Sequence, residues 1–109
     1  MSDQPATPVS TGSDIVIEPV WLVEATYAPD GAEARIPFRA EHLAGIAARK
    51  AAGVIVEAGA FADVSATIII VRAADEAEAL AIVSDDVYLR NGVWVELRAR
   101  RIGRVNEAG

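Results

Sequence analysis

Residues 39–59 read RAEHLAGIAARKAAGVIVEAG, and their pattern changes from helical to extended at Gly53. Apolar residues recur at spacings of three and four before that glycine, which predicts an amphipathic helix over residues 32–52 whose regular part begins near Pro37. Its predicted apolar stripe consists of Ile36, Ala40, Leu43, Ala47 and Ala51. Gly53 is a typical helix stop, and VIVEAG at residues 54–59 predicts a short strand. The stretch is therefore one helix followed by one strand.

Further strands and a second helix are predicted on both sides of this unit. A strand over residues 20–28 ends at the turn signal Pro29-Asp30-Gly31. On the other side, ATIIIVRA at 66–73 predicts a strand, residues 74–86 predict a helix capped by Asp75, and GVWVELRARRI at 92–102 predicts a last strand. In that strand, alternation predicts one face with Val93, Val95 and Leu97 and an opposite face with Trp94, Glu96, Arg98 and Arg100.

The resulting order, β-α-β-β-α-β, is that of a ferredoxin-like α+β fold, in which both helices cover one face of a four-stranded antiparallel sheet. The other face of the sheet would be bare. The continuous apolar run of residues 66–73 is typical of a strand buried on both faces, so we expect a homodimer in which two sheets face each other, with pockets near their interface.

The composition of the chain limits its number of domains, its partners, its cofactors and its location. The 109-residue chain fits one domain over residues 14–109, preceded by a disordered tail over residues 1–13 that is rich in Ser, Thr and Pro. The net charge of −6 argues against a nucleic-acid partner. With no cysteine and one histidine, neither a metal nor a cofactor is expected. No signal peptide and no membrane-spanning run is found, so we expect a cytoplasmic protein.

Three groups of residues resemble the YCII-related (YciI-like) family of the dimeric α+β barrel superfamily, similar in fold to muconolactone isomerase. The first group is Arg39, His42 and Leu43; the second is Ala58, Gly59 and Asp63; the third is Asp86 and Tyr88. Ala60 and Val87 stand where the family pattern has proline. The resemblance covers residues 21–105 and implies a site built on a His and Asp pair, here His42 and Asp86.

An imidazole with one nitrogen fixed by a carboxylate is suited to general acid/base chemistry near neutral pH. We therefore expect His42 to act as acid or base, Asp86 to orient it, and Arg39 and Tyr88 to contact a small-molecule substrate. Arg39 is also consistent with a surface ion pair, and His42 with a residue at the edge of the buried helix face.

The sequence is compatible with three functions. The first is an isomerase- or lyase-like enzyme acting on a small metabolite. The second is a non-catalytic dimeric module that binds a small molecule or regulates a partner. The third is an oxygenase similar to the cofactor-free monooxygenases of the same superfamily. Covalent acyl catalysis is not favoured, since there is no cysteine and no serine in a nucleophile-elbow motif.

Overall fold

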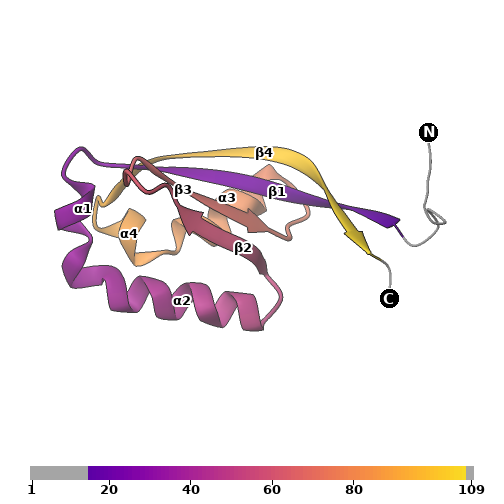
Figure 1. The fold of residues 1–109 in the computed structure, drawn as a ribbon, viewed down its shortest axis with the longest axis horizontal. Coiled ribbons are helices and arrows are strands. Elements are labelled where there is room, and N and C mark those ends of the chain that lie inside the picture. The colour runs from indigo at the N-terminus through magenta and orange to yellow at the C-terminus, as the bar shows by residue number, and fades with distance from the viewer. Residues whose placement is uncertain (1–14, 108–109) are drawn as a thin grey trace.

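A computed structural model describes residues 15–107 and shows a four-stranded antiparallel sheet with the strand order β2-β3-β1-β4 (Figure 1). The predicted tail over residues 1–13 lies outside the described residues. The strands are β1 (Ile15–Tyr27), β2 (Ile55–Ala60), β3 (Ala66–Val71) and β4 (Trp94–Glu107). Helices α2 (Arg39–Ala51) and α3 (Glu76–Ser84) pack on one face of the sheet. The predicted ferredoxin-like α+β fold is confirmed.

The first helical segment is divided into three parts by its sequence. A short helix α1 (Gly31–Ala34) is followed by a 3₁₀ turn η2 (Ile36–Phe38) that contains Pro37, and α2 begins after it. Gly53 ends the segment with a φ of +80°, which is a backbone conformation that glycine adopts without a steric penalty. Asp75 caps α3 by accepting a hydrogen bond from the Glu78 amide at 2.9 Å, as predicted.

The predicted apolar stripe of the first long helix is wrong. Ile36 and Leu43 are 69% and 46% exposed, and the three alanines of the stripe are exposed as well. The helix instead turns inward its half-buried residues Phe38, Ile46 and Arg49 together with buried His42. Alanine gains little free energy from burial, so the alanine spacing did not determine which side of the helix is covered. His42 therefore lies on the buried face and not beside it.

The start of β4 also differs from the predicted alternation. Tyr27 pairs with Trp94 and Thr26 pairs with Glu96, so Val95 is an extra residue in a β-bulge and is 59% exposed. Trp94, which was expected on the polar face, is buried in the core. The bulge was not visible in the sequence because it leaves the local alternation of residue types intact.

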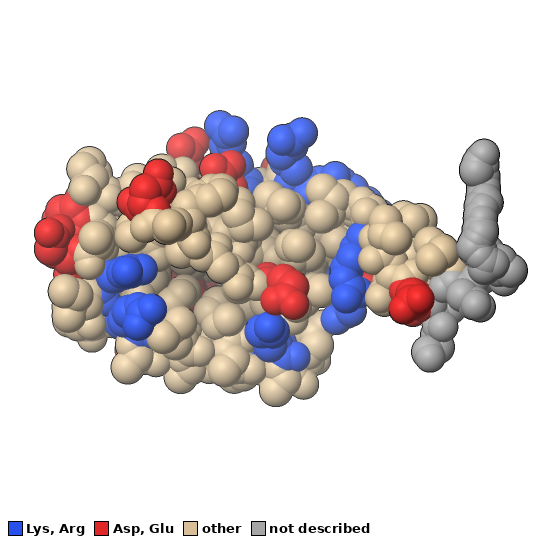
Figure 2. Space-filling model, viewed as in Figure 1, with Lys and Arg blue, Asp and Glu red and all other residues tan. Residues whose placement is uncertain are grey.

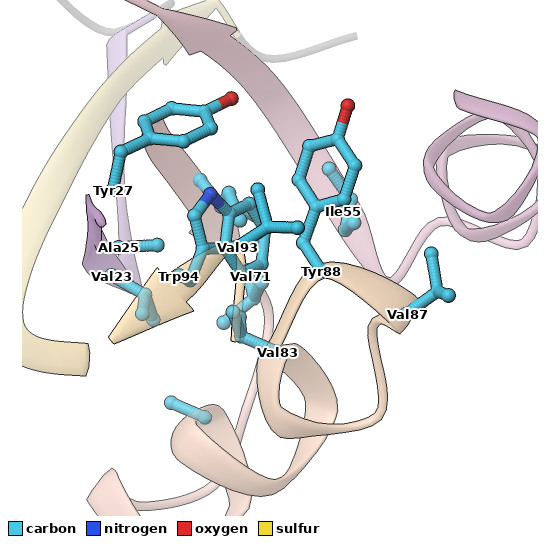
Figure 3. Packing of buried hydrophobic residues seen from close by; sticks show 12 residues of the cluster. Val23, Ala25, Tyr27, Ile55, Val71, Val83, Val87, Tyr88, Val93 and Trp94 are labelled. Carbon is cyan, nitrogen blue, oxygen red and sulfur yellow. The ribbon is translucent and has the colours of Figure 1, made fainter. Parts of the chain in front are cut away.

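A short helix, α4 (Val87–Arg90), lies between α3 and β4 and was not predicted. The predicted helix over residues 74–86 ends at Ser84, and the chain then restarts as α4 with Asp86 as its N-cap. The Asp86 carboxylate accepts a hydrogen bond from the Tyr88 amide at 2.8 Å. This change of direction buries Val87 and Tyr88 against the core (Figure 3).

Strands β1 and β4 extend beyond the rest of the sheet as a two-stranded arm (Figure 1). The predictions began β1 at residue 20 and ended β4 at residue 102, whereas pairing continues to Ile15 and Glu107. Pro19 lies in this arm, where β1 has β4 as its only paired strand and a residue without an amide hydrogen is tolerated. Glu18 binds Arg104 at 3.0 Å across the arm and Arg72 at 2.5 Å.

Glu18→Gln is expected to lower the midpoint of thermal unfolding. The hydrogen bond from Arg72 holds the pKa of Glu18 below its ordinary value of 4.5, with Arg104 acting in the same direction. A lowered pKa means that the stabilisation is present above the unfolded-state value and is lost as the pH falls through the folded-state value. The difference between wild type and variant should therefore vanish in acid and shrink in high salt. Glu107→Gln, on the same arm, is the control and should leave the midpoint unchanged.

Candidate functional site

The single imidazole and the Asp86 carboxylate, 44 residues apart in the sequence, form a buried hydrogen-bonded pair. His42 Nδ1 lies 2.9 Å from Asp86 Oδ1 and 2.8 Å from Oδ2. The two residues are only 8% and 6% exposed. The carboxylate only accepts hydrogen bonds, so Nδ1 is the donor, and in the neutral ring Nε2 then carries the free lone pair.

Aromatic packing fixes the plane of the His42 ring. Tyr88 stacks on it with a centroid distance of 3.9 Å and an interplanar angle of 8°. Trp94 meets the imidazole edge-on at 5.4 Å and 89°. Since α4 supplies both the carboxylate and the stacking ring, the turn at residues 85–87 positions the imidazole from two sides.

The two positions where proline is replaced are compatible with this geometry. Val87 is the first residue of α4, a position where proline is common because the amide there has no partner within the helix. The Asp86 cap starts the helix there without proline. Ala60 is the last residue of β2 and lines the cavity next to His42.

A cavity of about 160 Å³ lies beside the pair, between the helical segment of residues 35–46 and strands β2 and β3. Figure 2 shows positive side chains gathered beside a hollow in this face, over the start of α2. Among the residues that line the cavity there is no aspartate and no glutamate. They are Tyr27, Arg35, Arg39, His42, Leu43, Ile46, Ala58, Gly59, Ala60, Thr67 and Tyr88.

The hydroxyls of Tyr27 and Tyr88 lie on the same side of the cluster that these two rings form with Trp94 (Figure 3). The Thr67 hydroxyl donates to the Tyr27 oxygen at 3.2 Å, so the Tyr27 hydrogen is free to be donated elsewhere. Burial raises the pKa of Tyr88 above its ordinary value of 10, against the opposing effect of Arg35 and Arg39. The Tyr88 hydroxyl is therefore a neutral hydrogen-bond donor at physiological pH.

A second cavity, of about 170 Å³, lies on the other side of the pair. Both His42 and Asp86 line it, whereas Asp86 does not line the first cavity. Two ion pairs occupy its rim: Arg49 with Asp85 at 2.6 Å, and Arg90 with Glu41 at 3.3 Å. His42 and Asp86 thus lie between the two cavities, and His42 lines both of them.

The structure brings all four predicted site residues together. Arg39 and Tyr88 line the first cavity with His42, and Asp86 stands behind the imidazole. The sequence analysis missed Arg35, Tyr27 and Thr67. The spacing of four residues between Arg35 and Arg39 was an available signal, and the inward alternation of β1 ends on Tyr27.

Residues 15–107 contain neither a cluster of metal ligands nor a membrane-spanning helix. No group of three or more His, Cys, Asp or Glu side chains there is placed to hold a metal ion. None of the helices in that range has the length and apolar character needed to cross a membrane.

Comparison with known proteins agrees with this fold. The structure of 5-chloro-2-hydroxyhydroquinone dehydrochlorinase from Burkholderia phenoliruptrix AC1100, in complex with 2,5-dihydroxybenzoquinone, is similar with a TM-score of 0.65. The two sequences are 22% identical, and the match covers 75% of this chain and 91% of that one. No curated protein sequence matches. The family model of the YCII-related domain matches residues 20–102, and the chain therefore belongs to the YCII-related family.

Proposed function

We propose that the chain is a small enzyme that transfers a proton on a ring-sized metabolite in an elimination or an isomerisation. His42 Nε2 is the acid or base, Asp86 orients the imidazole, and Arg39 and Tyr88 hold the substrate. The observation that carries the proposal is the buried contact of 2.8 Å between His42 Nδ1 and Asp86, which orients the ring of a residue that lines the first cavity and leaves Nε2 as its second nitrogen for proton transfer.

The proposed chemistry takes place on the keto form of the ring. In an isomerisation Nε2 removes a proton from the carbon beside the carbonyl, and in an elimination it removes the proton of a ring hydroxyl that is conjugated with the saturated carbon bearing the leaving group. The imidazolium that forms is stabilised by the Asp86 carboxylate, which stays ionised. Negative charge develops on a substrate oxygen, where the Tyr88 hydroxyl and the Arg39 guanidinium are the available donors. In an elimination a leaving group then departs with the electron pair, and in an isomerisation the imidazolium returns the proton to another carbon.

The structurally similar dehydrochlorinase suggests the first assay. Incubation with 5-chloro-2-hydroxyhydroquinone is expected to release chloride faster than buffer does. In D₂O, the ring hydrogens of 2,5-dihydroxybenzoquinone are expected to exchange faster with the protein than without it. Saturable binding of the quinone with neither reaction would contradict the enzyme and favour a non-catalytic binding module.

We also propose that two copies pair through the face of the sheet opposite the helices. Val23, Ala25 and Tyr27 of β1 point into the core, so the residues between them point to that opposite face. On it, Leu22 pairs with Ile70, and Glu24 lies between Ile68 and Arg98. Half-buried aliphatic side chains beside alternating charges are suited to a self-complementary interface.

Light scattering after size exclusion is expected to give twice the chain mass of 11.5 kDa. Ile70→Glu would place a charge in the centre of the paired faces and is expected to reduce the mass to that of one chain. Ile36→Glu adds the same charge on exposed η2 and should leave the dimer intact. A wild-type protein with the mass of one chain at micromolar concentration would contradict the pairing.

A further inference from the structure

The first cavity is rich in hydrogen-bond donors and poor in acceptors. Arg35 and Arg39 contribute guanidinium groups, which donate and never accept. The Tyr27 and Tyr88 hydroxyls add two further donors. Since no carboxylate lines the cavity, an amine or another cationic ligand would find no counter-charge there. The lining is complementary to a ligand whose polar atoms are mostly acceptors.

The two arginines of this cavity are uncompensated. Neither makes an ion pair within residues 15–107, whereas Arg49 and Arg90 at the second cavity are both paired with acids. Positive charge is therefore concentrated at the first cavity, although the whole chain carries a net charge of −6. Both Arg35 and Arg39 act on the Tyr88 hydroxyl, where their charge lowers the pKa against the larger effect of burial. Their positive field therefore reaches the inner part of the cavity.

The size and the remaining walls of the cavity limit the ligand further. A cavity of about 150 Å³ accommodates one benzene molecule, and this one measures about 160 Å³. Leu43, Ile46 and Ala58 supply apolar surface on its sides. A single flat ring with oxygen substituents matches the size of such a space.

We propose that this cavity binds a ring-sized oxyanion, in which a carboxylate or an ionised enol oxygen is carried on a single ring. Arg35 and Arg39 would bind the charged oxygens, and the Tyr27 and Tyr88 hydroxyls would donate to the oxygen on the far side of the ring. The inference rests on the proposed function in treating this cavity as the substrate site. It concerns binding alone, so it can fail separately from catalysis.

The test compares benzoate with benzamide, which has the same shape and no charge. Titrations followed by the His42 ring signals in NMR spectra are expected to give a dissociation constant about tenfold lower for benzoate. Arg35→Gln and Arg39→Gln should each weaken benzoate binding by about five- to tenfold without changing benzamide binding. Arg101→Gln, which changes an exposed arginine of β4 that lies over Trp21 and lines neither cavity, is the matched control and should change neither.

Equal affinity for benzoate and benzamide, or no perturbation of His42 by either probe, would overturn the assignment. An effect of Arg101→Gln as large as that of Arg35→Gln would also overturn it, because the attraction would then come from overall charge and not from the cavity. Benzoate selectivity in a protein that exchanges no ring hydrogen would support the oxyanion site and refute the enzyme. Ring-hydrogen exchange without benzoate selectivity would support the enzyme and refute the oxyanion site.

Discussion

His42→Gln is expected to lower the rate of ring-hydrogen exchange by about 10²–10⁴-fold, the usual contribution of a general acid or base. Glutamine can still donate a hydrogen bond to Asp86, so the buried carboxylate keeps a partner and the fold is retained. Its amide cannot take up a proton at neutral pH. The measurement is the exchange rate of 2,5-dihydroxybenzoquinone in D₂O, with circular dichroism to establish that the variant is folded.

Asp86→Asn provides the second arm of this experiment. Asparagine caps helices as well as aspartate does, so α4 should still begin at residue 87. The variant loses the charge that stabilises the imidazolium, and its exchange rate is also expected to fall. Wild-type exchange in His42→Gln would contradict a role for the imidazole in proton transfer, and wild-type exchange in Asp86→Asn would restrict the carboxylate to capping α4.

Trp94→Ala is expected to cost about 3–5 kcal/mol of unfolding free energy, the typical range for removing a large buried aromatic side chain. Trp94 is 1% exposed and packs against Tyr27, Tyr88 and His42 with ring centroids 5.4–6.4 Å away. The same change should release the His42 ring from its edge-on contact and reduce turnover. Urea unfolding at neutral pH measures the first effect, and the exchange assay measures the second.

Two variants serve as controls for the Trp94 prediction. Trp94→Phe keeps most of the ring, and because the Trp94 Nε1 hydrogen has no hydrogen-bond partner among the described residues, its loss should cost little. Trp21→Ala removes a half-buried indole at the edge of the same core and should cost less than Trp94→Ala. Equal losses from Trp21→Ala and Trp94→Ala would contradict the central place given to Trp94.

Much of the fold could be predicted because local signals agreed with it. Gly53 and Asp75 marked a helix end and a helix start through backbone chemistry that acts within a few residues. The ferredoxin-like fold class followed from the order of strands and helices along the chain. The pairing of His42 with Asp86 came from the family resemblance, since no local pattern links residues 44 positions apart.

The incorrect predictions have a common physical cause. The inward face of α2, the bulge at Val95 and the α4 turn all depend on how distant elements pack, and the competing local patterns differ by little free energy. An alanine-rich helix can turn either side inward, and in the structure the inward side is the one on which His42 contacts Tyr88 and Asp86. Arg35 and Tyr27 were missed for the same reason, because Arg35 follows α1 and Tyr27 ends β1, and the cavity that both residues line exists only once these elements have packed together.

Asp86 has two roles in the structure, and only one of them concerns the proposed reaction. The same carboxylate starts α4 through the Tyr88 amide and holds the imidazole. A descendant that abandoned the proposed proton transfer would still need a capping side chain, aspartate or asparagine, at position 86, whereas it would be free to replace His42. Retention of aspartate or asparagine at this position in a relative therefore indicates the shared turn, and the residue facing it on α2 distinguishes relatives that are able to carry out the proposed reaction from those that have only the same fold.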